Sequence, residues 1–167
     1  MNKAPRSSTP PLLFMLAGIP TSGKSTYISK LLRDFPDAVV ISTDDYIEAV
    51  ARETGKTYNE VFNDNIKAAR MDLNDKVNSA IRARQTIIWD QTNLTSSVRH
   101  KKLSRFPKSY IKALVYFNID LDTALERNAN RPGKVIPPAL LREMHNNYEL
   151  PTDADRTNFS NIIKGGN

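Results

Sequence analysis

The sequence has 167 residues, 40% of them hydrophobic, which is enough apolar material for the core of one domain and too little for two. It contains no cysteine, which excludes a disulfide framework, a thiolate metal site and a cysteine nucleophile. Since there are only two histidines, any metal is expected to be a hard ion bound by oxygen. The net charge of +6 favours polyanionic partners such as nucleic acid or nucleotides.

The chain is expected to form one cytoplasmic domain without a membrane partner. No stretch reaches the roughly 18 to 20 apolar residues of a membrane span, and residues 1–11 lack the apolar centre of a secretory signal. The same residues are polar and contain prolines. We therefore expect a disordered lead-in at 1–11 and a single domain at 12–167.

The first part of the chain predicts a strand, a helix, a second strand and a second helix. The apolar run LLFMLA is typical of a strand buried on both faces, and a glycine-rich turn leads from it into the first helix. AVVIS predicts the second strand, after which Thr43 or Asp44 is expected to cap the second helix. These elements cover about residues 12–17, 24–34, 38–42 and 43–53.

The rest of the chain continues the alternation of strands and helices. Apolar residues at helical spacing over 57–84 predict one long helix or two joined by a kink. Further strands are expected at 86–90 and 111–119 with an edge strand at 161–164, and further helices at 98–106, 120–130 and 138–148. This order predicts a three-layer α/β domain whose mainly parallel sheet has four to five strands, with a ligand at the carboxyl ends of the strands.

Residues 18–25, GIPTSGKS, fit the pattern GxxxxGK[ST] of a phosphate-binding P-loop and lie between a predicted strand and a predicted helix. Glycines let backbone N–H groups wrap a phosphate, and the start of the helix adds its positive dipole end. Lys24 is expected to reach the β- and γ-phosphates and Ser25 to supply a hydroxyl to Mg²⁺. The nucleotide-binding residues expected in this segment are Gly18, Thr21, Ser22, Gly23, Lys24, Ser25 and Thr26.

Carboxylates follow two of the predicted strands. Asp44 lies just after the second strand, where a kinase can place the base that accepts a proton from an attacking hydroxyl. The alternative for Asp44 is a helix cap, which is the role we favour for Asp45. Asp90 ends the third strand and can orient substrate or a metal-bound water, whereas Thr92 and Asn93 after it can simply build the turn. The predicted substrate-binding residues are Asp44, Asp45, Asp90 and Asn93.

Two arginines lie at the end of a later helix and the start of a basic loop, RPGKVIPP. Arg127 and Arg131 are four residues apart, so both can point the same way. A mobile lid that carries them can close over the phosphates and stabilise charge during transfer. The helix dipole alone also favours basic residues at this place. We expect both arginines to bind nucleotide, and Arg131 to be catalytic together with Lys24 and Asp44.

Two other features have simpler alternatives. The segment 99–112 has six basic residues and no acidic one, so it either binds a nucleic-acid backbone or is a solvated helix face. The six are Arg99, Lys101, Lys102, Arg105, Lys108 and Lys112. Asp120 and Asp122 superficially resemble a phosphatase aspartate pair, but the glycine and threonine that should follow are absent, so we expect them to cap a helix.

Taken together, the segments GIPTSGKST, STDDY, WDQTN and ERNANRPGK over about residues 12–150 resemble the kinase domain of phage-type polynucleotide 5′-kinases. The resemblance implies a P-loop kinase fold in which ATP phosphorylates the 5′-hydroxyl of DNA or RNA. It implies that Asp44 is the general base and that Arg131 stabilises the transferring phosphate, beside Lys24 and Ser25.

The sequence departs from this family in three places. Well-studied members have an arginine three positions after the catalytic aspartate that holds the substrate, and here that residue is Ile47. Those members continue into a phosphatase domain, for which this sequence has no motif, so 3′-dephosphorylation is not expected. WDQTN has one extra residue, which leaves the role of Asp90 open.

We therefore expect an ATP- and Mg²⁺-dependent kinase that acts on a hydroxyl of a nucleic acid, with the 5′-hydroxyl end of DNA or RNA as the favoured acceptor. If the chain comes from a phage, its expected location is the host cytoplasm. One alternative is a kinase of a hydroxymethylated base in DNA or of a small molecule, which Ile47 favours. Another is a nucleotide-dependent nucleic-acid-binding protein without transfer activity, favoured by the basic balance. The absence of an NKxD-type motif argues against a GTPase.

Overall fold

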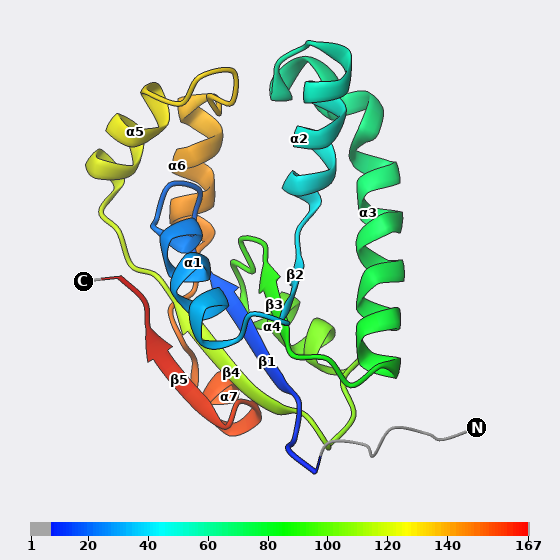
Figure 1. Ribbon diagram of the computed structural model, residues 1–167. Helices are drawn as coiled ribbons and strands as arrows, with labels where there is room; N and C mark the ends of the chain where they lie inside the picture. The colour runs from blue at the N-terminus through cyan, green and yellow to red at the C-terminus, as the bar shows by residue number, and fades with distance from the viewer. Residues whose placement is uncertain (1–7, 167) are drawn as a thin grey trace.

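The computed structural model describes residues 8–166, which form a five-stranded parallel sheet between two layers of helices (Figure 1). The strands are β1 (Leu12–Ala17), β2 (Val39–Ile41), β3 (Ile87–Asp90), β4 (Ile111–Tyr116) and β5 (Asn161–Lys164). Their spatial order is β2-β3-β1-β4-β5, and all four pairings are parallel. The predicted α/β fold is thus confirmed, and its sheet is parallel throughout.

The helices follow the predicted order with one addition. They are α1 (Lys24–Asp34), α2 (Thr43–Thr54), α3 (Tyr58–Arg82), α4 (Ser96–Leu103), α5 (Leu121–Ala129), α6 (Pro138–Asn147) and α7 (Asp153–Asn158). The segment for which one or two helices were expected is one helix of 25 residues. The sequence analysis missed α7, although Thr152 and Asp155 form a reciprocal capping box at its start.

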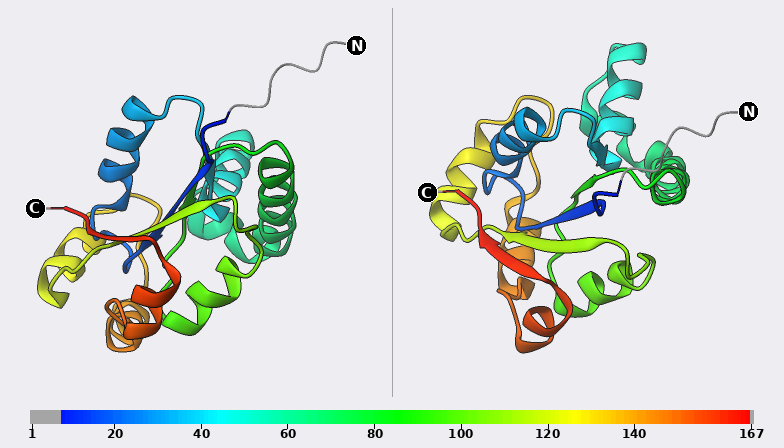
Figure 2. Two further views of the ribbon diagram at one scale, coloured as in Figure 1. Left: turned by 90° about the horizontal axis from the view of Figure 1, so that it is seen from below. Right: turned by 60° about the horizontal axis from the view of Figure 1, so that its bottom comes forward.

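Alternate residues of β1 build the two halves of the core, as expected for a strand buried on both faces. Leu13 and Met15 pack on one face with residues of α3 and α4, and Phe14 and Leu16 pack on the other with residues of α1. Figure 2 shows α1 on one side of the sheet and α4 and α7 on the other. The helices α2 and α3 pack against each other through a separate apolar cluster.

Helix capping differs from the prediction at one functionally important place. Ser42, and not Thr43 or Asp44, caps α2: its backbone is extended, and its Oγ accepts a hydrogen bond from the Asp44 N–H at 3.1 Å. The short serine hydroxyl satisfies this first-turn donor, so the Asp44 carboxylate remains available for other partners. At α5 the prediction is confirmed, because the Asp120 Oδ1 accepts from the Thr123 N–H at 2.9 Å.

The packed domain begins at the end of the segment expected as a disordered lead-in. Most of the expected lead-in, residues 1–7, lies outside the described residues. Pro11 is buried, and its carbonyl accepts a hydrogen bond from the Ile111 N–H at 3.0 Å, so it already belongs to the packed domain. Among the described helices none is both long and apolar enough to cross a bilayer.

Candidate active site

The P-loop leaves β1 at Gly18 and enters α1 at Lys24, and its backbone shape depends on two glycines. A Cβ at Gly18 would lie 2.7 Å from the Ser22 Oγ and 3.0 Å from the Phe117 Cβ, so any other residue would require neighbouring side chains to move. Gly23 has φ of 103° and occupies the N-cap position of α1 with no side chain to cap it. The first N–H groups of α1 are therefore left for an anionic ligand, as expected for a phosphate cradle.

The charged residues expected at the site influence one another through Lys24. Its Nζ donates to the carbonyl oxygens of Gly18 at 2.7 Å and Ile19 at 3.0 Å. Burial lowers the pKa of Lys24 to about 8, the carboxylates of Asp90 and Asp44 oppose this shift, and the Arg131 charge lowers it further. Such coupling requires proximity, so the structure brings residues from the P-loop, α2, β3 and the region after α5 into one site.

Two buried polar atoms at this site have no hydrogen-bond partner within residues 8–166: the Ser22 Oγ and the Arg131 Nη1. Buried polar groups in native proteins almost always have a partner, so such atoms indicate a missing ligand. A hydroxyl in the P-loop and a guanidinium nitrogen both suit phosphate oxygens. The residues present therefore fit a nucleotide.

Ser25 and Thr26 lie exposed in the first turn of α1. Within residues 8–166 there is no group of three His, Cys, Asp or Glu residues placed to hold a metal ion. Mg²⁺ in kinases is typically held by one or two protein oxygens together with the substrate phosphates. The Ser25 hydroxyl suits this arrangement, and a metal cage made of protein side chains alone does not occur in the described part of the chain.

Asp44 is held at the mouth of the site by residues that the sequence analysis did not single out. Its Oδ1 accepts from the Tyr58 hydroxyl at 2.6 Å, and its Oδ2 lies 3.5 Å from the Lys134 Nζ. Burial, followed by this hydrogen bond to Asp44, raises the pKa of Tyr58. The Asp44 side chain is 49% exposed, so a partner-held carboxylate remains accessible to an incoming hydroxyl.

The basic loop at residues 130–137, called the lid loop below, bridges the two sides of the site. Its Gly133 and Val135 carbonyls accept hydrogen bonds from the backbone and side chain of Asn59, at the start of α3. The Asn128 side chain makes two hydrogen bonds to the backbone of Ile136 and so ties the loop to α5. In this structure the loop is thus held from two sides, by α3 and by α5, and its expected role as a mobile lid stays a prediction.

The two predicted arginines approach the P-loop from α5 and the lid loop. Arg127 is exposed, and its Nη1 donates to the Thr21 carbonyl at 3.0 Å. The Thr21 Oγ1 in turn donates to the Ala124 carbonyl at 3.3 Å, which uses the side chain to join the P-loop to α5. Arg131 lies directly after the end of α5, half-buried, with its charge acting on Lys24 and Tyr58.

Of the two residues expected to bind substrate at the end of β3, Asp90 joins the site and Asn93 does not. Burial raises the pKa of Asp90, against the charge of Lys24. Asn93, expected to bind substrate, is 2% exposed and has a positive φ of 45°. Its Nδ2 donates to the Leu16 carbonyl at 2.6 Å and its Oδ1 accepts from Lys102. Because its amide is fully used inside the fold, Asn93 builds the turn and is not available to a substrate.

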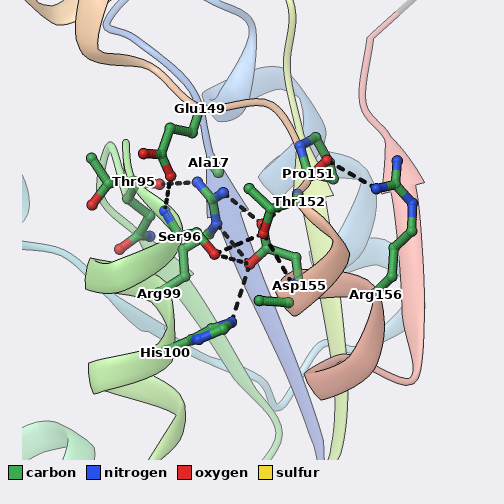
Figure 3. Close-up of polar contacts among 12 residues, drawn as sticks. Ala17, Thr95, Ser96, Arg99, His100, Glu149, Pro151, Thr152, Asp155 and Arg156 are labelled. Atoms are coloured by element: carbon green, nitrogen blue, oxygen red, sulfur yellow. Dashed lines mark hydrogen bonds and ion pairs between the residues drawn. The ribbon is translucent and has the colours of Figure 1, made fainter.

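A buried ion pair between α4 and α7 stabilises the turn that follows β3 (Figure 3). Arg99 donates from Nε and Nη2 to the two carboxylate oxygens of Asp155, at 3.2 Å and 2.6 Å, and both side chains are 0% exposed. The Arg99 Nη1 also donates to the carbonyls of Asn93 and Leu94. α4 and α7 thus hold the chain directly after β3 in place.

The same contacts change the interpretation of the basic segment 99–112. Arg99 is buried, Lys102 binds Gln91 and Asn93, and Arg105 binds two asparagines of α3. Burial lowers the pKa of Lys102 to about 8. The six basic residues therefore do not form one open face for a nucleic-acid backbone, because half of them have structural partners.

The α2 residues after Asp44 also differ from expectation. Asp45 does not cap the helix, and its pKa is raised by partial desolvation and by the carboxylates of Glu48 and Asp44. Ile47 is 0% exposed and packs between α2 and α3. Position 47 thus points into the core, so the family arginine has no counterpart here that faces the site. Glu48, which the sequence analysis did not select, faces Lys134 at 2.6 Å.

A parallel sheet with a P-loop between its central strand and the following helix, flanked by helices on both faces, defines a P-loop kinase fold. Binding of ATP is implied by this fold. Residues 13–151 match the model of the family described as AAA domain, and the chain belongs to this family.

Solved structures share the fold at low sequence identity. A protein from Chloroflexus aurantiacus, described as a kinase, has a TM-score of 0.67 at 17% identity, with 95% of this chain and 86% of that one covered. A gluconokinase from Sinorhizobium meliloti has a TM-score of 0.56 at 16% identity, with 93% and 82% covered. A chain of the Pnkp1/Rnl/Hen1 complex has a TM-score of 0.57 at 18% identity. The match covers 74% of this chain and only 41% of that one.

Proposed function

We propose that this protein is an ATP- and Mg²⁺-dependent kinase that transfers the γ-phosphoryl group to a hydroxyl of a nucleic acid, at the 5′-hydroxyl end of DNA or RNA. The observation that carries the proposal is that Lys24, Asp44 and Asp90 lie at or just after the carboxyl ends of the adjacent strands β1, β2 and β3, and that the charge of Arg131, from the loop after α5, also acts on Lys24. A P-loop lysine, a carboxylate base and a lid arginine are the parts that in-line phosphoryl transfer requires.

In this mechanism Asp44 accepts the proton of the attacking hydroxyl as its oxygen bonds to the γ-phosphorus. The bond from that phosphorus to the β-phosphate oxygen breaks, and ADP leaves. Lys24 and the P-loop N–H groups hold the phosphates, and Arg131 offsets the charge that develops on the transferring group. Mg²⁺ held with Ser25 would neutralise phosphate charge, and in this proposal Asp90 would orient the ion or a water bound to it.

The net charge of +6 and the resemblance to polynucleotide 5′-kinases support a nucleic-acid acceptor. The fold likeness to a chain of the Pnkp1/Rnl/Hen1 complex is compatible with it. Ile47 does not argue against this acceptor, since it is a core residue and no acceptor would reach it.

A specific observation favours a second candidate, a kinase of a small hydroxyl compound or of a hydroxymethylated base. Asp44, Asp45 and Glu48 make the first turns of α2 acidic, which suits a neutral or cationic acceptor better than a phosphate directly beside the reacting hydroxyl. The gluconokinase, by its name, acts on a small molecule, and it shares the fold.

The test is incubation of the purified protein with γ-labelled ATP, Mg²⁺ and matched oligonucleotides that carry either a 5′-hydroxyl or a 5′-phosphate. The proposal predicts label on the hydroxyl-ended strand alone. Label on neither strand, with ATP bound, would reject the 5′-end acceptor, and labelling of hydroxymethylated DNA or a small alcohol would support the second candidate. ATP binding with no transfer to any acceptor would reject both.

A further inference from the structure

A cavity of about 550 Å³ lies between the lid loop and the corner that joins α2 to α3. The charged residues that line it are Glu48, Arg52, Lys56 and Lys134. Lys134 is paired with Glu48 at 2.6 Å, so these two charges offset each other. Arg52 and Lys56 are exposed and neither forms an ion pair within residues 8–166, although the charge of Lys56 acts on the nearby Glu60 carboxylate. With three cations and one carboxylate in its lining, the cavity carries a net charge of 3 − 1 = +2.

This cavity adjoins the proposed base through shared residues. Tyr58 lines the cavity and donates to the Asp44 Oδ1 at 2.6 Å, while Lys134 lines it and lies 3.5 Å from the Asp44 Oδ2. Asp44 itself does not line the cavity, so these two side chains are what join the cavity to the proposed base. Figure 1 shows the corner of α2 and α3 that forms one wall, at the end of α2 away from the sheet.

The helical spacing sets the reach of such a ligand. Asp44, Glu48 and Arg52 are four residues apart in α2 and follow one side of the helix. Arg52 lies about 12 Å along the helix axis from Asp44, at about 1.5 Å per residue. A nucleic-acid strand carries one phosphate per roughly 3.4 Å of helix axis. The cation pair is thus placed for phosphates several nucleotides from the reacting end, beyond the acidic first turns.

We propose that this cavity is the subsite that binds the backbone phosphates of the acceptor strand, with Arg52 and Lys56 as its phosphate-binding residues. The inference rests on the proposed nucleic-acid kinase function. It separates the two parts of acceptor recognition: Asp44 and its neighbours receive the hydroxyl, and the lysine and arginine at the α2–α3 corner hold the strand. The basic segment 99–112, half of whose basic residues have structural partners, is not needed for this role.

The experiment compares Arg52→Ala/Lys56→Ala with the matched control Lys67→Ala/Arg70→Ala, which removes two exposed positive charges from α3 outside the cavity. Acceptors are a 5′-hydroxyl oligonucleotide and a nucleoside 3′-monophosphate, which is too short to reach the corner. Each phosphate contact on a single strand contributes about 0.7 to the slope of log K against log salt. Losing two contacts should lower that slope by about 1.4 and raise the KM for the oligonucleotide about 25-fold near 0.1 M salt.

The proposal also predicts that kcat at saturating oligonucleotide, the KM for the nucleoside 3′-monophosphate and the Kd for ATP stay within about twofold of wild type. If the wild-type enzyme labels the oligonucleotide and the cavity variant behaves like its control, the subsite assignment is wrong while the proposed function stands. If the cavity variant loses activity equally on both acceptors, its residues act in catalysis or folding and the assignment is again wrong. If wild type labels no oligonucleotide, the proposed function fails and the subsite with it.

Discussion

Replacing Asp155 by alanine should strongly destabilise the fold, because it leaves Arg99 buried without its counter-charge. The carboxylate accepts two hydrogen bonds from Arg99 and one from the Thr152 N–H, and both charged side chains are 0% exposed. Removing one member of a buried ion pair typically costs about 3–5 kcal/mol. With a urea m-value of about 2 kcal/mol/M for a small domain, the unfolding midpoint should fall by about 2 M.

The assay is urea unfolding followed by the fluorescence of Trp89, the single tryptophan, which is 1% exposed in β3. The control is Asp153→Ala in the same short helix, where the carboxylate is fully exposed and its ion pair with Arg156 spans 3.5 Å in solvent. The control should unfold at the wild-type midpoint within error. Equal urea unfolding midpoints for Asp155→Ala and the control would refute the argument that the buried ion pair stabilises the fold beneath the site.

Three further predictions concern the site itself. Asp44→Asn should lower kcat by about 10²-fold or more while the Kd for ATP stays within about twofold, since it removes the proton acceptor only, and an unchanged kcat would exclude Asp44 as the base. Burial lowers the pKa of Lys24 to about 8, and a bound phosphate favours its charged form, so ATP binding should weaken as the pH rises above 8 and should be accompanied by uptake of a proton. Calorimetry at pH 8.5 in two buffers with different ionisation enthalpies measures this proton uptake. No uptake would contradict the prediction. Ile47→Arg should cost about 3 kcal/mol or more in thermal or urea unfolding, because it buries a charge between α2 and α3; a variant as stable as wild type with tighter oligonucleotide binding would contradict the core assignment.

Local patterns were enough for the sheet and the P-loop. Each buried parallel strand is a continuous apolar run that needs no partner to be recognised, and the P-loop pattern is contiguous. Tyr58 and Lys134 could not be found in this way, because they contact Asp44 from 14 and 90 residues away along the chain. The sequence offers only a weak signal for each residue: Tyr58 is a polar aromatic residue at the start of a predicted helix, and Lys134 is a basic residue in the predicted lid loop.

In the basic segment 99–112 the positive charge was evident from the sequence, but the structural role of the individual residues was not. A run of lysines and arginines predicts charge, yet it does not predict that Arg99 pairs with a carboxylate 56 residues later. Only the three-dimensional packing of α4 against α7 removes this charge from the surface. The exposed cations that we propose for binding a polyanion are instead Arg52 and Lys56.

The central claim is that the site at the carboxyl ends of β1, β2 and β3 transfers a phosphoryl group from ATP to a hydroxyl, with Asp44 as the proton acceptor. The most direct measurement is the single-turnover rate of label transfer from γ-labelled ATP to a 5′-hydroxyl oligonucleotide, for the wild-type protein and for Asp44→Asn at equal ATP saturation. We predict rapid transfer by wild type and a rate about 10²-fold or more lower in the variant. Equal rates for the two proteins, or no transfer by wild type with ATP bound, would contradict the claim.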